Sequence, residues 1–164
     1  MPAVTTQEVS DAVAAVVDPE LPVLTLADLG VVRDVRLDRG RAVVSITPTY
    51  LACPALGAIK DDVRSAVAAL GLEAQVEVVL SPPWHPGLIT DRGRARLEAA
   101  GIAPPGSSPT PGATDLGMPA PIGARCPQCG APDAPVLSER GPTPCTAIHV
   151  CAACGEPFEK VRDR

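Results

Sequence analysis

Hydrophobic residues recur along the first hundred positions with two different periods, and this pattern predicts alternating helices and strands. A capping box at Thr5–Glu8 marks a helix start. Apolar residues at helical spacing follow it on one face, at Val9, Val13, Val16 and Val17. Pro19 should end this helix. The next stretch, 18–30, is predicted to be an acidic loop whose leucines pack inward.

Period-two patterns then predict a hairpin. Residues 31–37 and 41–47 flank the turn Asp38-Arg39-Gly40, and the second segment alternates in a way that suits a sheet with one covered face. A helix should follow, with Pro54 at its first position and Gly71 as its stop. Its apolar stripe comprises Leu56, Ile59, Val63, Val67 and Leu70. Residues 74–80 predict a third strand, with Val76, Val78 and Leu80 on one side.

The order α-β-β-α-β predicts an α/β (α+β) fold with two layers, in which helices cover a small mixed sheet. Residues 81–103 add a Pro/Trp loop and a short helix near Thr90 to Ala100. The stretch 104–123 is so rich in proline and glycine that it predicts a linker. The expected domains are therefore 1–103, the linker 104–123, and a small module at 124–164.

Two Cys-x-x-Cys pairs dominate the C-terminal module. Cys126 and Cys129 are separated from Cys151 and Cys154 by 21 residues, and a glycine follows each pair. This spacing is typical of a four-thiolate zinc ribbon, with a positive-φ glycine in each tight turn and a short hairpin between the pairs. Four thiolates close the coordination shell, so the zinc would be structural. Iron suits the same four ligands, and two disulfides in a secreted chain are the other alternative.

The charge balance narrows the classes of partner. The chain has 14 basic and 19 acidic residues and a net charge of −5, with no basic half. A nucleic-acid-binding ribbon would show a cationic stripe, so no nucleic acid partner is expected. The N-terminus lacks the features of a signal peptide, and no apolar run is long enough for a membrane span. We therefore expect a cytoplasmic protein whose thiols are available to metal.

Cys53 is the second chemical feature, because it lies between a predicted strand and the start of a helix. Backbone N–H groups and the helix dipole should favour a thiolate there, as in a nucleophile, a metal ligand or a cluster ligand. The alternative is a small, buried apolar residue. The acidic residues Asp18, Glu20 and Asp28 could act in acid–base chemistry or bind cations, or simply cap helices and turns.

Other residues have less specific interpretations. Cys145 is surplus to a four-cysteine site and is either a packed or a second reactive thiol. His85 and His149 are alternative metal ligands, or else surface or hydrogen-bonding imidazoles. Trp84 either anchors a partner or covers a sheet edge. No phosphate-binding loop or hydrolase motif is present, so the chain is not expected to be an enzyme by itself.

The chain resembles a known family along nearly its whole length outside the linker. Asp18-Pro19-Glu20, the Leu-Ala-Asp-Leu-Gly-Val-Val run at 26–32 and Cys53-Pro54 are similar to the MIP18 (DUF59) domain. Three further segments resemble the PaaD-type subunit associated with phenylacetyl-CoA oxygenase (1,2-epoxidase): Ser-Pro-Pro-Trp at 81–84, Gly-Ile-Ala-Pro-Pro at 101–105, and the cysteine-rich ending at 151–158.

The resemblance implies an accessory role in aerobic phenylacetate degradation, in which the chain helps to mature an iron–sulfur cluster or metal centre. Cys53 matches the family's candidate cluster-handling cysteine, Asp18 and Glu20 match its acidic motif, and the four ribbon cysteines match its zinc ligands. The implied cofactors are structural zinc and a transient iron or iron–sulfur cluster. The implied partners are the oxygenase and reductase subunits and iron–sulfur assembly proteins. A non-catalytic structural adaptor is the alternative function.

Overall fold

The computed structural model describes residues 4–50, 52–106 and 124–163. The chain forms two compact units, Met1–Gly93 and Arg94–Arg164, and each is considered by itself. Most of the predicted linker lies outside the described residues. The division into units falls at Gly93, and the domain bounds expected from the sequence stay predictions.

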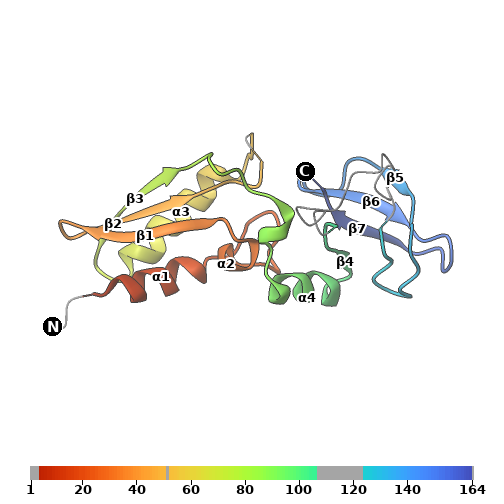
Figure 1. The fold of residues 1–164 in the computed structure, drawn as a ribbon, viewed down its shortest axis with the longest axis horizontal. Helices are drawn as coiled ribbons and strands as arrows, with labels where there is room; N and C mark the ends of the chain where they lie inside the picture. Colours follow the sequence, from red (N-terminus) through yellow and green to blue (C-terminus); the bar gives the residue numbers. More distant parts are fainter. Residues whose placement is uncertain (1–3, 51, 107–123, 164) are drawn as a thin grey trace, which may run out of the picture. The chain divides into compact units, whose positions relative to one another are not determined.

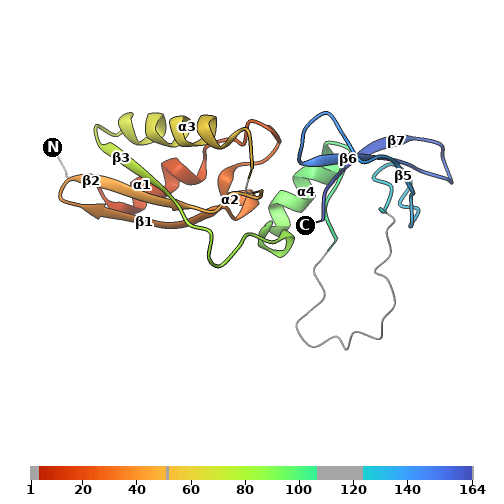
Figure 2. The same cartoon turned by 90° about the horizontal axis from the view of Figure 1, so that it is seen from above.

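The first unit is a three-stranded sheet covered by helices. Strands β1 (Val32–Asp38) and β2 (Arg41–Ile46) pair antiparallel, and β3 (Glu73–Val78) pairs parallel to β2. Helix α3 (Leu56–Ala68) makes the crossover that a parallel pair requires, and α1 (Thr6–Ala14) contacts both β1 and α3. Both helices therefore lie on one face of the sheet (Figures 1 and 2). The predicted α-β-β-α-β order and mixed sheet are confirmed.

The hairpin between β1 and β2 closes through a two-residue turn. Arg39 and Gly40 have φ angles of 49° and 80°, and Asp38 pairs directly with Arg41. Two consecutive positive φ angles are the mark of the turn whose twist matches that of the flanking strands. Strand β2 is the middle strand of this sheet, because β3 pairs with its other edge.

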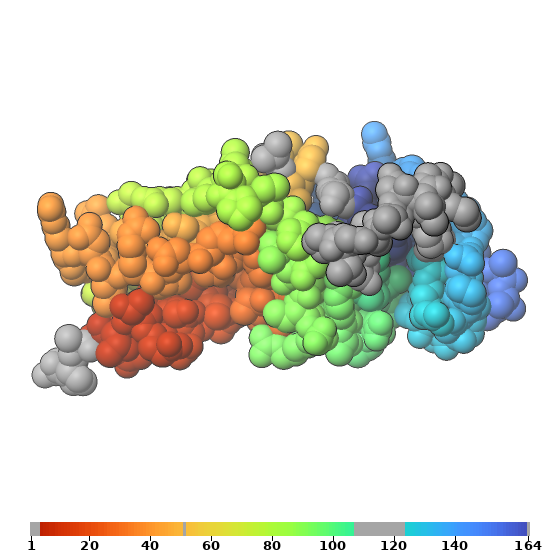
Figure 3. Space-filling model, viewed as in Figure 1, coloured from red at the N-terminus to blue at the C-terminus, as the bar shows by residue number. Residues whose placement is uncertain are grey.

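The helices cover one face of the sheet, as expected, but strand β2 is buried on both faces. Val43 and Ser45 are 5% and 6% exposed, although the helices lie on the opposite face. Arg36 pairs with Val43 in the register, and Glu77 pairs with Ser45. The ion pair Arg36–Glu77, at 3.5 Å, therefore spans β2 and covers its outer side. Figure 3 shows the orange part of the chain, which includes β1 and β2, on the side that faces the viewer.

The segment 18–30 contains a helical turn where only a loop was expected. Helix α2 (Leu26–Leu29) begins with a capping box formed by Thr25 and Asp28 and ends at Gly30, whose φ is +66°. A four-residue helix is too short to produce a periodic apolar pattern. The expectation that the leucines of this segment pack inward is confirmed for Leu21, Leu24, Leu26 and Leu29.

Both long helices of the first unit differ from their predictions at one end. Helix α1 ends at Ala14, so Val17 leaves the apolar face and is 47% exposed. Helix α3 begins at Leu56 with Ala55 as its N-cap, so Pro54 precedes the helix instead of occupying its first position.

The end of helix α3 agrees with the prediction, whereas the end of strand β3 does not. The stop of the helix near Gly71 is confirmed, since this glycine has a φ of +79°. The strand is shorter than predicted, because Leu80 lies beyond its last residue and is 54% exposed.

The second unit is a small sheet that carries the cysteine pairs. Its four strands, β4 (Ile102–Ala103), β5 (Val136–Ser138), β6 (Thr146–Val150) and β7 (Pro157–Val161), lie in the order β4-β7-β6-β5. Strands β5 and β6 form the predicted hairpin, whereas β4 pairs parallel to β7. The 3-10 helix η1 (Pro86–Leu88) and α4 (Asp91–Ala99) precede this sheet, and α4 matches the short helix predicted there.

Candidate functional site

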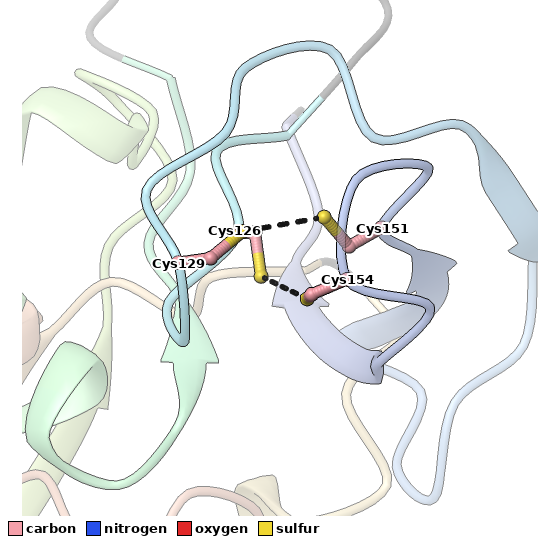
Figure 4. Close-up of side chains that lie close together, drawn as sticks. All are labelled: Cys126, Cys129, Cys151 and Cys154. Carbon is pink, nitrogen blue, oxygen red and sulfur yellow. Dashed lines mark hydrogen bonds between the residues drawn. The ribbon is translucent and has the colours of Figure 1, made fainter.

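The four cysteines of the two pairs lie together in the second unit (Figure 4). Their sulfur atoms are all within 4.8 Å of one another. Each pair forms a tight turn in which the following glycine donates its N–H to the carbonyl of the first cysteine, Gly130 to Cys126 and Gly155 to Cys151. Both glycines have positive φ angles, 74° and 76°, as the sequence predicted.

The sulfur distances fit a tetrahedral metal centre. Cys126 Sγ lies 3.8 Å from Cys154 Sγ, and Cys129 Sγ lies 3.5 Å from Cys151 Sγ. A tetrahedron with metal–sulfur bonds of about 2.3 Å has edges of about 3.8 Å, whereas the sulfurs of a disulfide are about 2.05 Å apart. All six cysteines are free thiols. The donor set therefore suits a four-thiolate metal ion and excludes the disulfide alternative for this arrangement.

Each of the two turns contains one buried and one exposed cysteine. Cys126 and Cys151 belong to a buried cluster with Ala103, Ala124, Ala134 and Phe158, while Cys129 and Cys154 are exposed. The backbone N–H groups of Cys154 and Ala153 point at the Cys151 sulfur and lower the pKa of its thiol to about 6. These N–H groups thus favour the thiolate of Cys151, which is the form that binds metal.

His149 and Cys145 lie outside this ligand set. His149 is 3% exposed, its Nδ1 donates a hydrogen bond of 2.8 Å to the carbonyl of Ala134, and its ring stacks on Phe158 at 5.8 Å. The hydrogen-bonding interpretation of His149 is therefore confirmed, and the surface interpretation is wrong. Cys145 is half-buried and its carbonyl accepts the N–H of Arg162.

Cys53 lies in the first unit, in the loop between β2 and α3. Its N–H donates to the carbonyl of Tyr50, and its own carbonyl accepts the N–H of Leu56. Burial raises the pKa of the Cys53 thiol, and the carboxylates of Asp18 and Glu20 raise it further, against hydrogen bonds from the N–H groups of Ala55 and Leu56. Burial and two negative charges thus oppose the thiolate expected at this helix start, and they outweigh the two hydrogen bonds that favour it.

Asp18 is held in place by the turn that follows it. Its Oδ1 accepts the N–H groups of Glu20 and Leu21 at 2.9 and 2.8 Å, and the residue is 7% exposed. Burial raises the pKa of its carboxyl against those two hydrogen bonds. The carboxylates of Asp18 and Glu20 are thus near enough to Cys53 to affect the pKa of its thiol. Among the described residues, however, the only group of three or more His, Cys, Asp or Glu side chains placed to share a metal ion is the four cysteines.

Asp28 caps the N-terminus of α2, so it is set apart from the other two acidic residues, Asp18 and Glu20. Its Oδ2 accepts from the N–H and hydroxyl of Thr25, and its Oδ1 accepts from Arg92 Nε at 2.7 Å. Burial alone would raise its pKa, but the Thr25 hydrogen bonds and the Arg92 guanidinium lower it to about 2. Asp28 is therefore a buried anion that stabilises α2.

Hydrogen bonds from Arg33 and Trp84 hold the loop that follows β3. The role of Arg33 was not predicted from the sequence. Arg33 Nε donates to Thr47 Oγ1 at 2.9 Å, and its Nη2 donates to the carbonyls of Pro82 and Pro83 at 3.3 Å. Trp84 Nε1 donates to the carbonyl of Leu29 at 2.7 Å, which favours the structural interpretation of the tryptophan. The partners of Arg33 lie 14 to 50 residues away, so no local signal reveals them.

Comparisons with known proteins divide the chain in the same two parts. The family model for an iron–sulfur cluster assembly protein matches residues 6–78, and the model for the PaaD zinc beta ribbon domain matches residues 111–162. An Escherichia coli protein named as a component of 1,2-phenylacetyl-CoA epoxidase is 37% identical over 143 residues, covering 87% of this chain and 83% of that protein. The chain belongs to the PaaD family.

The N-terminal part of this PaaD-family chain has further relatives. The Fe-S protein maturation auxiliary factor YitW of Bacillus subtilis is 37% identical over 81 residues, which cover 48% of the chain and 78% of that protein. A crystal structure of a DUF59 domain from Bacillus anthracis matches with a TM-score of 0.52 at 31% identity, covering 56% of the chain and 90% of the domain. The PaaD-family chain therefore combines a DUF59 domain with a zinc ribbon that carries a metal-binding cysteine cluster.

A membrane-spanning helix is not found in the described part of the chain, where no helix has the necessary length and apolar character.

Proposed function

We propose that the chain is an accessory protein of aerobic phenylacetate degradation that assists the maturation of an iron–sulfur cluster or metal centre in the phenylacetyl-CoA epoxidase system. The observation that carries the proposal is the similarity to the epoxidase component of Escherichia coli along most of the chain, combined with the iron–sulfur assembly match at residues 6–78. The clients in this proposal are the oxygenase and reductase subunits, and iron–sulfur assembly proteins are the donors.

Cys53 is the proposed residue that receives iron or a cluster. It is half-buried, and its backbone is hydrogen-bonded to Tyr50 and Leu56 in the loop before α3. As the only cysteine of the first unit, it supplies one ligand, and the remaining ligands of a transferred cluster would come from the donor or the client. A single protein ligand suits a transient carrier, because a complete ligand set would retain the cargo.

Asp18 and Glu20 give this site its proposed selectivity for cations. Burial raises the pKa of the Cys53 thiol and their charges raise it further, which disfavours the thiolate that oxidants and alkylating agents attack. An arriving iron centre favours the thiolate of Cys53 instead. Its positive charge is attracted by the two carboxylates, and coordination deprotonates the thiol. The acidic pair thus protects the free cysteine and favours the metal-bound one.

Cys126, Cys129, Cys151 and Cys154 are the proposed ligands of a structural zinc ion. Their sulfur separations match a tetrahedral centre, and four thiolates leave no open position for a substrate. The buried part of the second unit is small, so the metal would supply much of its folding free energy.

The proposed maturation role is tested by replacing the cysteine of the first unit. Wild type, Cys53→Ser and the control Cys145→Ser are purified anaerobically, and their zinc, iron and acid-labile sulfide are measured. The same variants are then tested for the cluster content of the client reductase. We expect zinc in all three proteins, and a client with reduced cluster content only with Cys53→Ser. Full maturation of the client by Cys53→Ser would contradict the carrier role.

A structural adaptor is the second candidate function. It is favoured by the raised pKa of the buried Cys53 thiol and by the lack of a second metal-ligand group among the described residues. An adaptor predicts a stable complex with the oxygenase components that is indifferent to Cys53→Ser. The maturation experiment therefore separates the two functions.

A further inference from the structure

We propose that the segment 82–92 holds Cys53 and Asp18 in position, because it is bonded to both halves of the site that they form. This segment follows β3 and lies beyond residues 6–78, which the iron–sulfur assembly model matches. One half of the site is the loop between β2 and α3, which carries the cysteine, and the other is the segment 16–29, which ends with α2. The inference rests on the proposed function, in which this cysteine receives iron or a cluster.

Arg33 joins the segment 82–92 to the loop that carries Cys53. Its Nη2 donates to the carbonyls of Pro82 and Pro83 at 3.3 Å, and its Nε donates to Thr47 Oγ1 at 2.9 Å. Thr47 is 2% exposed and directly follows β2, so it begins the loop that leads to Cys53. A guanidinium has several donors in one rigid plane, and here it fastens the start of the segment to the start of the loop.

Trp84, Thr90 and Arg92 join the same segment to α2. The last carbonyls of a helix have no partner within the helix. In α2, the carbonyl of Leu29 accepts from Trp84 Nε1 at 2.7 Å, and the carbonyl of Asp28 accepts the N–H of Thr90 at 2.9 Å. Arg92 adds the ion pair with the carboxylate of Asp28 at 2.7 Å. A helix of four residues is not stable by itself, so these contacts hold α2 in place.

Helix α2 in turn fixes the backbone around Asp18. The N–H of Leu26, the first residue of α2, donates to the carbonyl of Val16 at 2.8 Å. The N–H of Asp18 donates to the carbonyl of Leu24 at 3.0 Å. A displacement of α2 would therefore move Asp18, whose carboxylate is near enough to Cys53 to affect the pKa of its thiol.

Amide hydrogen exchange in the full, zinc-loaded chain reports on each half of the site. In one half, the N–H groups of Glu20 and Leu21 donate to Asp18 Oδ1. In the other half, the N–H of Cys53 donates to the carbonyl of Tyr50. The exchange rates of these amides, measured by NMR, give the opening of each half separately, and the amides of the central strand β2 report on the opening of the whole unit.

Trp84→Phe removes the indole donor and keeps an aromatic ring, and Arg33→Gln removes the guanidinium. Trp84 is bonded to the α2 side and Arg33 to the Cys53 side. If one segment holds both halves, each variant should speed exchange in both halves by about fivefold, with the β2 amides changed less than about twofold. Arg41→Gln is the control, because it removes an exposed ion pair with Glu73 and should change none of these rates.

Two exchange results would overturn the inference. Faster exchange only in the half that contacts the changed residue would mean that the two contacts are independent, and an equal increase at β2 would mean that they only stabilise the unit. The cluster content of the client reductase is then measured, and it should fall with Trp84→Phe and Arg33→Gln but not with Arg41→Gln. A client that is fully matured by the first two variants, but not by Cys53→Ser, would overturn the positioning role. Full maturation by Cys53→Ser would instead reject the proposed function, and the exchange rates would still decide whether the segment holds both halves.

Discussion

The carboxylate of Asp18 acts on the thiol of Cys53, although 35 residues separate them in the sequence. Asp18 is held by two backbone N–H groups in the turn before α2, and Cys53 lies in the loop after β2. Burial raises the pKa of the Cys53 thiol, and the charge of Asp18 raises it further, so the free thiol is less acidic than usual. This pair distinguishes the site from a reactive cysteine at a helix start, where the backbone favours the thiolate.

Removing the charge of Asp18 should make Cys53 more reactive. Asp18→Asn keeps an oxygen for the N–H groups of Glu20 and Leu21 but removes one of the charges that raise the Cys53 pKa. The pKa should fall, so the alkylation of Cys53 by iodoacetamide at neutral pH should become faster. The rate is followed by mass spectrometry of the peptide that contains Cys53. Asp34→Asn, at an exposed position on β1, should leave the rate unchanged; an equal increase there would reject the specific role of Asp18.

Removing one ribbon ligand should unfold the second unit and leave the first intact. Cys126→Ser deletes a buried sulfur of the four-cysteine cluster, and a three-ligand site holds zinc more weakly. We expect loss of zinc and collapse of the amide signals of β5, β6 and β7 in an NMR spectrum, with those of β1 to β3 retained. Cys145→Ser should keep zinc and the full spectrum. Retention of stoichiometric zinc by Cys126→Ser would show that this cysteine is not a ligand.

The stability contributed by Asp28 should depend on pH at acidic values. Its pKa is lowered from 3.8 to about 2, so the folded protein binds a proton less readily than the unfolded chain. This contribution is fully present above the unfolded pKa, decreases as pH falls below about 4, and is lost as pH falls through about 2. Compared with Asp28→Asn, the wild type should be more stable by about 2 kcal/mol at pH 7, and the difference should vanish near pH 2.

Urea unfolding at several pH values measures this difference. Asp61→Asn is the control, since its ion pair with Arg64 is exposed on both sides and should contribute little at any pH. A difference between wild type and Asp28→Asn that stays constant from pH 7 to pH 2 would contradict the role assigned to the charge.

Gly30 should tolerate no side chain, for a reason beyond its backbone conformation. A Cβ atom at Gly30 would lie 2.3 Å from the carbonyl oxygen of Leu88, whereas a Cβ at Gly71 meets nothing within 4 Å. Both glycines have positive φ angles, so Gly71→Ala should cost only the backbone strain, about 1 kcal/mol. Gly30→Ala should cost about 2 kcal/mol more, because the clash involves backbone.

Unfolding followed by the fluorescence of Trp84 compares the two glycine variants. This tryptophan donates a hydrogen bond to the carbonyl of Leu29, next to Gly30, and therefore reports on the affected region. Equal destabilisation by the two variants would show that the segment around Leu88 can move away at little cost.

Local patterns in the amino-acid sequence were sufficient to predict several parts of this protein. Residues 3.6 or 2 positions apart share a face, so periodicity located α1, α3 and the three strands of the first sheet. The Cys-x-x-Cys pairs with their glycines indicated the metal ribbon, because the turn around a metal is encoded within five residues. Local patterns failed where an element was too short to have a period, as at α2.

Long-range contacts set the remaining features, because the chain must fold before distant residues can meet. The charge of Asp18 on Cys53, the attachment of Arg33 to the loop after β3, and the pairing of β4 with β7 all join segments far apart in the sequence. The protonation preference of Cys53 is the clearest case. Its neighbours in the sequence favour a thiolate, and the opposite outcome follows from burial and from charges that the fold brings across the end of the sheet.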